Sequence, residues 1–484
     1  MKEINMLEKK SKHMNSAEFR KYGYAVIDWI ADYYDNIENY PVKSQMKPGD
    51  IRASLAKNPP QLGESMDNIL EDIDRIIMPG ITHWQSPKFF GYFPTNTSGP
   101  SILADLISSG FGVNGMLWET SPACTELETH VLDWLATMLN LPNQFISQNN
   151  GGGVIQDTSS SAALCAMIAA REKKNNGNSN FFGCRESLTA YVSTQTHSSI
   201  EKAAMVAGVG SKNVRLIDIN DDFSMNVSSL KKQIMKDIKD GYIPFFVCAT
   251  VGTTSSNAID SVYDIGKICD EYKLWMHVDA AMAGTASLCP EYQYLQKGVE
   301  YADSYSFNPH KWMLTNFDCS CLFIKNRDEL ISALAIMPEY LKNQSSGSGE
   351  VIDYRDWQIP LGRRFRSLKL WAVIRYYGTE GLQNYVRYHV DMAQQFLSWV
   401  TNDNRFEIMA PAPLNLICFR VKGSDKLNED LLNYINNSGE IFITHTKLNE
   451  LFTLRICIGQ THTDINHVKE AWGFIKSSLE KIRG

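Results

Sequence analysis

Three side chains capable of chemistry follow segments that are typical of buried strands. Asp279 ends the apolar run WMHVD, His197 follows AYVSTQT, and Lys311 follows SYSFNPH. Taken singly, the aspartate would cap a turn, the histidine would be a satisfied polar group, and the lysine would be a solvated charge. If the strands are parallel neighbours in one sheet, however, their carboxyl ends share an edge, and the three side chains converge there.

An amine, a carboxylate and an imidazole at one site suit pyridoxal phosphate. Lys311, desolvated and with a lowered pKa, supplies the amine for a Schiff base. Asp279 suits the protonated pyridine nitrogen, which lets the ring accept electrons from a carbanion, and His197 is a flat partner for the ring face. The phosphate needs donors at a helix N-terminus, where Ser159 and Ser160 follow GGGVIQDT and begin an alanine-rich helix. These glycines do not match GxGxxG, which disfavours a nicotinamide dinucleotide.

Alternating strands and helices are expected to carry these residues. From Gly151 onward, short apolar segments alternate with helical ones, and uniformly apolar runs such as FFVCATV fit burial on both faces of a sheet. This pattern predicts an α/β fold with a mainly parallel central sheet. Strands are expected at 188–193, 214–217, 244–251, 275–278, 304–307 and 319–325, and helices at 198–208, 228–239 and 259–272. The glycines at 151–153 are expected to form a flexible approach to the phosphate.

Two smaller regions are predicted to flank the large domain at 99–368. The first, 1–98, is a helical segment in which aromatic residues recur at helical spacing between Phe19 and Ile37. A helix this aromatic needs a partner surface, from this chain or from a second subunit. The other region, 369–484, is a small α+β domain with strands at 415–421 and 452–456. NQSSGSG, at 343–349, is expected to be a flexible insert.

Composition argues against several function classes. A net charge of -7 opposes binding to a phosphate backbone, so nucleic acid is not expected as a partner. The N-terminus is polar and no run of about eighteen apolar residues occurs, so neither a signal peptide nor a membrane span is expected. The ten cysteines lack zinc-type spacing, no metal is expected, and Cys319 and Cys321 are expected to pack as neutral thiols. Reduced cysteines indicate a cytoplasmic protein.

Several motifs resemble one enzyme family. NPHKW, HVDAAMAG, STQTHSS and GGGVIQ closely match the group II pyridoxal-phosphate decarboxylases, and among them the aromatic-L-amino-acid decarboxylases. The resemblance continues through HWQSPKFFGYFPT, MPEYLKN and QIPLGRRFRSLKLW to RICIGQTHTDINHVKEAW, so it spans nearly the whole chain after Ser16. It implies the type I fold of the PLP-dependent transferases and a homodimer that builds its sites at the subunit interface.

The resemblance also implies a role for each matched residue. Lys311 forms the internal aldimine, Asp279 pairs with the pyridine nitrogen, and His197 stacks on the ring. Ser159, Ser160 and Asn308 hold the phosphate, and Thr254 and His310 are further cofactor contacts. The small Ala281, close to Asp279, leaves room under the ring. Asp157 departs from the glycine that many relatives carry just before the hydroxyl run, which affects the expected shape of the phosphate loop.

The substrate contacts are implied in the same way. The residues that line the pocket are expected to be Trp84, Tyr92, Phe93 and Thr95. Thr95 would lie near the substrate carboxylate, and Met116 would reach the neighbouring subunit's site. Gly362 matches a position that holds serine in the histidine-selective relatives, so its missing side chain leaves volume for a catechol, phenol or indole. DOPA, 5-hydroxytryptophan, tyrosine, phenylalanine and tryptophan all stay open as substrates.

Since this fold supports several reactions, the reaction is predicted from single residues. Tyr340, in MPEYLKN, matches the mobile-loop tyrosine that protonates the substrate carbon in the decarboxylases, whereas the aldehyde synthases carry phenylalanine there. Because Tyr340 and His197 are both present, decarboxylation to an arylalkylamine is favoured, with Lys311 and Asp279 as the other catalytic residues. The alternatives are an aromatic aldehyde synthase, a decarboxylase of aliphatic amino acids, and an inactive binding protein that keeps the scaffold.

Overall fold

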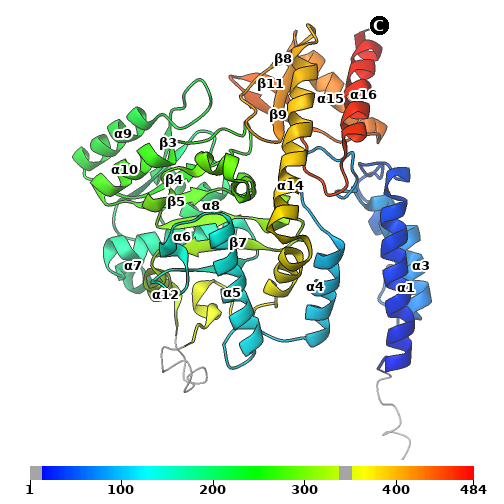
Figure 1. Ribbon diagram of the computed structural model, residues 1–484, viewed down its shortest axis with the longest axis horizontal. Coiled ribbons are helices and arrows are strands. Elements are labelled where there is room, and N and C mark those ends of the chain that lie inside the picture. Colours follow the sequence, from blue (N-terminus) through cyan, green and yellow to red (C-terminus); the bar gives the residue numbers. More distant parts are fainter. Residues whose placement is uncertain (1–12, 337–350, 484) are drawn as a thin grey trace, which may run out of the picture.

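The computed structural model describes residues 13–336 and 351–483 and is organised around a seven-stranded sheet (Figure 1). The strands lie in the order β1-β7-β6-β5-β4-β2-β3. Neighbours from β6 to β3 are parallel, whereas β7 is antiparallel to both β6 and β1. Their bounds are β1 Gly152–Gln156, β2 Leu188–Ser193, β3 Val214–Ile217, β4 Ile243–Thr250, β5 Trp275–Asp279, β6 Ser304–Phe307 and β7 Ser320–Ile324. The predicted α/β fold with a mainly parallel sheet is confirmed.

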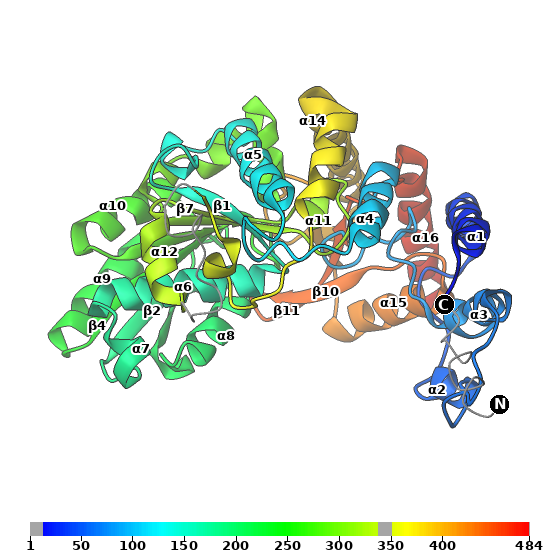
Figure 2. The same cartoon turned by 90° about the horizontal axis from the view of Figure 1, so that it is seen from below.

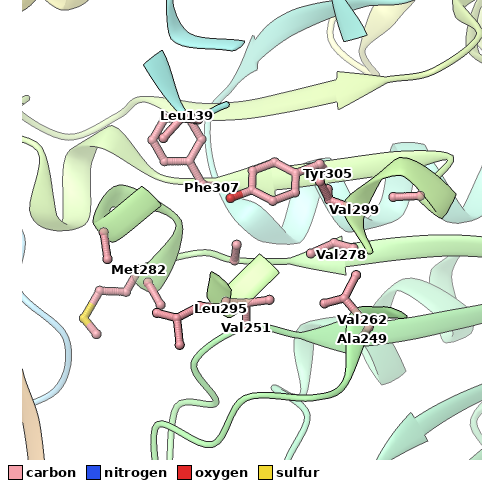
Figure 3. Close-up of a cluster of buried hydrophobic side chains, with 14 of the residues drawn as sticks. Leu139, Ala249, Val251, Val262, Val278, Met282, Leu295, Val299, Tyr305 and Phe307 are labelled. Carbon is pink, nitrogen blue, oxygen red and sulfur yellow. The ribbon is translucent and has the colours of Figure 1, made fainter. Parts of the chain in front are cut away.

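Helices cover both faces of this sheet. One face packs through side chains such as Phe246 and Leu322 against α6 (Ser159–Asn175), α8 (Ser199–Val206) and α12 (Arg327–Leu334), with α7 (Asn178–Phe182) beside them. The other face packs through side chains such as Val278 and Phe307 (Figure 3) against α5 (Pro122–Met138), α9 (Val227–Lys239) and α10 (Val262–Tyr272). In Figure 2, α5 and α8 lie on opposite sides of the sheet. Burial of both faces explains why the central strands are apolar throughout.

The C-terminal region forms a second, antiparallel sheet of four strands in the order β10-β11-β9-β8. Its elements are β8 Phe406–Ile408, β9 Leu416–Val421, α15 Asp425–Ser438, β10 Thr444–Leu448, β11 Leu451–Cys457 and α16 Ile465–Arg483. The long helix α14 (Ser367–Thr401) joins the two sheets (Figure 1). Its residues Leu370 and Val373 belong to the core of the large sheet, whereas Phe396 and Val400 belong to the core of the small one.

Four helices precede α5, namely α1 Ser16–Asp35, α2 Asp50–Ser54, α3 Met66–Asp72 and α4 Gly99–Phe111. A capping box starts α1, because Asn15 accepts from the Glu18 N–H while the Glu18 carboxylate accepts from the Asn15 N–H. No residue of α1 is buried, and it runs beside α3 at the edge of the molecule (Figures 1 and 2). Within residues 13–336 and 351–483, no helix combines the length and apolar character that crossing a membrane requires.

The expectation of a flexible glycine segment at 151–153 was wrong. Gly152 and Gly153 lie in β1, and all three glycines are buried. A Cβ on Gly151 would lie 1.9 Å from the Gln144 carbonyl oxygen, and one on Gly153 would lie 2.9 Å from the Phe323 ring. Close packing of neighbouring segments therefore demands glycine here. The sequence pattern also does not predict the edge strands β8 and β10, and the insert at 343–349 lies outside the described residues.

Candidate active site

A cavity of about 250 Å³ opens at the carboxyl ends of the parallel strands. Among its lining residues are all those that the sequence analysis assigns to the cofactor: Ser159, Ser160, His197, Thr254, Asp279, Ala281, Asn308, His310 and Lys311. The lining is completed by Phe93, Thr158, Thr250, Gly252 and Phe317. The fold therefore gathers residues at or after the ends of β1, β2, β4, β5 and β6, together with Phe93 from the segment before α4, around one hollow.

Lys311 reaches the cavity from α11 (Pro309–Trp312), the short helix that follows β6. Its Nζ lies 5.1 Å from the centre of the Phe93 ring. Within the described residues the amine has no hydrogen bond and no ion pair. Burial lowers the pKa of Lys311, and the Asp279 carboxylate opposes part of this effect. A lowered pKa increases the fraction of neutral amine, which is the form that attacks a carbonyl carbon.

Asp279 is the last residue of β5 and is 5% exposed. Its Oδ1 accepts a hydrogen bond of 3.0 Å from the Ala281 N–H, which holds the carboxyl group at the end of the strand. Thr250, the last residue of β4, lies beside it in the sheet register. The Thr250 hydroxyl is buried and has no hydrogen-bond partner in the described part of the chain. The edge of the sheet therefore presents a carboxylate and a hydroxyl side by side.

His197 lies in the loop after β2, just before α8. Its Nδ1 accepts from the Ser199 N–H at 3.2 Å and lies 2.9 Å from Ser199 Oγ. Desolvation lowers the pKa of His197; the charge of Asp279 raises it and that of Lys311 lowers it further. The ring is therefore neutral at neutral pH, with its proton on Nε2 because Nδ1 is an acceptor.

One end of the cavity is formed by the start of α6 and by residues that follow β6. Asn308 Oδ1 accepts from Ser159 Oγ at 2.9 Å and from Ser320 Oγ at 2.6 Å. The first N–H groups of a helix have no intrahelical partner, so those of α6 are available to an anion. Asp157, which departs from the family pattern, accepts from the Thr158 N–H at 2.8 Å.

His310 is held by the backbone rather than free to move protons. Its Nδ1 accepts from the Cys319 N–H at 2.9 Å, and its ring packs on Phe317 with 4.4 Å between the centroids. Burial, with help from the charge of Lys311, lowers the pKa of His310 to about 3. Cys319 and Cys321 are both fully buried, and burial raises the pKa of Cys321 well above its usual value.

The sequence analysis misses four residues of the lining, namely Thr158, Thr250, Gly252 and Phe317. Thr250 ends a parallel strand just as Asp279 does, so the rule that identifies Asp279 would also have identified it. Phe317 lies in a loop and is 53% exposed, and no local pattern marks it.

Comparison with known proteins decides the family. The model of the pyridoxal-dependent decarboxylase conserved domain matches residues 48–422. The chain belongs to this family. Tyrosine decarboxylase 2 of Narcissus pseudonarcissus is 48% identical over 477 residues, which cover 96% of this chain and 95% of that protein. Phenylacetaldehyde synthase of Arabidopsis thaliana is 47% identical over 480 residues, 97% of this chain and 98% of that protein.

The fold comparison agrees. The crystal structure of Oryza sativa TDC with PLP and tryptamine matches with a TM-score of 0.96 and 39% identity, covering 98% of this chain and all of that chain. The present chain is thus a pyridoxal-phosphate-dependent decarboxylase with the family fold along nearly its whole length.

The residues of the cavity fit pyridoxal phosphate. Lys311 offers an amine without a partner in the described residues, and Asp279 has a second carboxylate oxygen beside the one that accepts from Ala281. The buried hydroxyl of Thr250 lacks a partner within the described residues as well. The amine suits the aldehyde of the cofactor, the carboxylate suits its pyridine nitrogen, and the N–H groups at the start of α6 suit its phosphate.

The aromatic residues expected at the substrate lie on the segment before α4. Phe93 lines the cavity, whereas Trp84 and Tyr92 stack on one another beyond it, with 5.5 Å between ring centroids. Tyr92 is 52% exposed and adopts a left-handed backbone with φ 55°. Thr95 does not line the cavity, and its carbonyl accepts from Gln85 Nε2 at 2.6 Å.

Met116 and Gly362 do not line this chain's cavity. Asn114 connects their segments, because its Oδ1 accepts from the Arg363 N–H at 2.9 Å, and the Arg363 carbonyl accepts from the Gly115 N–H at 3.0 Å. Gly362 is exposed and Met116 is partly exposed. Tyr340 lies outside the described residues.

Proposed function

We propose that this protein removes the α-carboxylate of an aromatic L-amino acid and releases CO₂ and the arylalkylamine. The observation that carries the proposal is the convergence of Lys311, Asp279 and His197 on one cavity with Phe93 in its wall. Relatives along the full chain act on such substrates by name, including a tyrosine decarboxylase 48% identical to this chain.

Each polar residue has a distinct task in this proposal. Bound pyridoxal phosphate supplies an electron sink for the pair of electrons that the departing CO₂ leaves on Cα. Lys311 holds the cofactor through its amine, and the carboxylate of Asp279 keeps a proton on the pyridine nitrogen. His197, neutral and anchored to Ser199, covers one face of the ring. The Phe93 ring, 5.1 Å from Lys311 Nζ, excludes water from the reacting side.

Protonation of Cα decides between the two reactions found among the relatives. We assign it to the phenol of Tyr340, a general acid suited to deliver a proton to carbon. The second candidate function is aldehyde synthesis, which is favoured by the 47% identity to phenylacetaldehyde synthase. That reaction consumes O₂ and one water and yields an aldehyde, ammonia and hydrogen peroxide in place of the amine, while CO₂ is released as before.

Product analysis against a panel of amino acids tests the proposal. The purified holoenzyme is incubated with tyrosine, tryptophan, phenylalanine, DOPA, 5-hydroxytryptophan, glutamate and diaminobutyrate, and the products are identified by mass spectrometry. One amine per CO₂ from the aromatic acids is expected. Stoichiometric hydrogen peroxide and ammonia would assign the protein to the aldehyde synthases, and turnover of the aliphatic acids alone would overturn the aromatic assignment.

The protein is also proposed to act as a homodimer. Four side chains of α4 at helical spacing are each between 50% and 61% exposed in the single chain: Leu103, Leu106, Ile107 and Phe111. An apolar stripe of this kind on a soluble enzyme indicates a covered surface. Met116 and Gly362, which follow the sequence pattern of substrate contacts but do not line this chain's cavity, are then contributed to the partner's site.

Light scattering coupled to gel filtration tests the dimer. The wild type is expected at twice the chain mass, and L106E should shift it to the monomer with loss of activity. A fully active monomer would overturn the shared-site proposal.

We further assign the enzyme to the cytoplasm, and this is supported by ten free cysteines, of which nine are buried. Fractionation of the native cells tests the assignment, and finding the enzyme in membranes or in the medium would overturn it.

A further inference from the structure

A buried arginine near the cavity has no carboxylate partner. Arg455 lies in β11 and is 4% exposed. All three of its nitrogens donate to neutral oxygens: Nη2 to the Thr254 carbonyl at 2.5 Å, Nε to the Ser255 carbonyl at 3.2 Å, and Nη1 to Thr444 Oγ1 at 3.0 Å. No ion pair involves Arg455 within residues 13–336 and 351–483. Burying a guanidinium in this way is costly unless its donors are used well.

Two of these acceptors belong to the loop on the cofactor side. Thr254 lines the cavity, and Ser255 follows it in the loop after β4. The Ser255 carbonyl also accepts from Cys418 Sγ at 3.2 Å. The small sheet therefore holds this loop at two consecutive carbonyl groups, through Arg455 of β11 and Cys418 of β9.

The third acceptor leads to the aromatic segment. Thr444 Oγ1 accepts from Arg455 Nη1 and also from the Tyr92 N–H, at 3.2 Å. Tyr92 has φ 55°, a conformation that a bulky residue adopts only when its surroundings impose it. Its neighbour Phe93 lines the cavity. One guanidinium thus connects two segments of the site that are far apart in the chain.

We propose that Arg455 is a positioning residue that sets the distance between the cofactor loop at Thr254 and the aromatic wall at Tyr92 and Phe93. The rigid fork of a guanidinium directs its donors in fixed directions, so the two walls are held relative to the small sheet and to each other. Only the substrate readout of this inference rests on the proposed function, because release of the cofactor is measured without substrate.

Three variants separate the two branches of the bridge. T444V keeps the side-chain volume and removes the acceptor that the Tyr92 N–H shares with Arg455 Nη1, while the bonds from Arg455 to the Thr254 and Ser255 carbonyls remain. It should therefore raise KM for the aromatic substrate by about 2- to 10-fold, with kcat within about twofold and cofactor release unchanged. R455M removes both branches and should speed release of the cofactor by about 10- to 100-fold. R455K keeps the charge but not the fork, and should fail to restore wild-type release.

Arg420 of β9 provides a matched control in the same sheet. It is 2% exposed, but it pairs with Asp425 at 3.0 Å and contacts neither wall of the cavity. R420M should lower the thermal midpoint while leaving KM and cofactor release unchanged. Release is followed on the holoenzyme, after dilution into a cofactor trap, as loss of the imine absorption band.

Each outcome is decisive. Wild-type release and KM in folded R455M or R455K would overturn the bridge, and so would equal changes in R420M, which would reflect general loosening of the sheet. If the wild type fails to turn over aromatic amino acids, the proposed function falls, while faster cofactor release in R455M still supports the cofactor branch.

Discussion

We predict that breaking the buried ion pair between Arg363 and Glu128 destabilises the protein by about 3–5 kcal/mol. The guanidinium donates to the two carboxylate oxygens at 2.7 and 3.1 Å, and the side chains are 1% and 0% exposed. It also donates to the Ile155 carbonyl and to Gln358 Oε1, both at 2.9 Å. The R363M variant removes these four bonds and leaves a buried carboxylate whose remaining donor is the Ile155 N–H.

The magnitude comes mainly from the uncompensated charge, since water does not reach Glu128. The double variant R363M/E128L removes that charge as well. Its remaining cost is the unpaired polar groups of Ile155 and Gln358, about 1–3 kcal/mol for each one that stays buried without a partner. The double variant should therefore lose less free energy of unfolding than the losses of R363M and E128L added together. Its stability should be close to that of R363M alone, or higher.

Urea unfolding followed by tryptophan fluorescence, with saturating cofactor in every sample, measures these differences. R363M and E128L are each expected to lower the free energy of unfolding strongly, with a clear favourable coupling in the double-mutant cycle. Losses that simply add would refute the reasoning, because they would mean that the two charges do not compensate each other. Because Arg363 follows Gly362, KM should also rise in R363M.

Three further predictions concern the chemistry and the acid stability. K311A should abolish turnover and the imine absorption band that borohydride bleaches. A band that persists would mean that the cofactor is bound to another amine. Y340F should keep the cofactor but divert product to aldehyde, with hydrogen peroxide in equal amount, and an unchanged amine yield would discard Tyr340 as proton donor. Burial lowers the pKa of His389 to about 3, while Trp312 Nε1 donates to its Nδ1 at 2.9 Å. The unfolded imidazole binds a proton below about pH 6.5, so stability is lost as the pH falls from there towards 3, by about 2 kcal/mol at pH 5. H389N should therefore show a smaller drop in urea midpoint between pH 7 and pH 5 than the wild type, and an equal drop would contradict this assignment.

The central elements could be predicted from the sequence because their signals are local. The strands β2, β3 and β6 have the predicted bounds, since each is a short run that is followed directly by a polar residue, Thr194, Asp218 and Asn308 respectively. The rule that parallel strands share a carboxyl edge then brings Asp279, His197 and Lys311 to one cavity. Only the parallel order had to be assumed.

Other features depend on contacts between distant segments. The glycines at 151–153 are small because Gln144 and Phe323 approach them, and no neighbouring residue in the sequence reveals that approach. The sequence marks His310 as a cofactor contact, but it does not reveal that the Cys319 N–H holds the ring through Nδ1.

Sequence alone therefore predicted that Asp279, His197 and Lys311 meet and at which edge of the sheet, because strand periodicity and strand ends are properties of short segments. The tertiary structure decided how those residues are held. Arg455 connects Thr254 to Thr444, and through it to Tyr92, across more than three hundred residues of chain. Such a bridge follows from the packing of the small sheet against the large one, which is set by the fit of two surfaces and not by any local pattern.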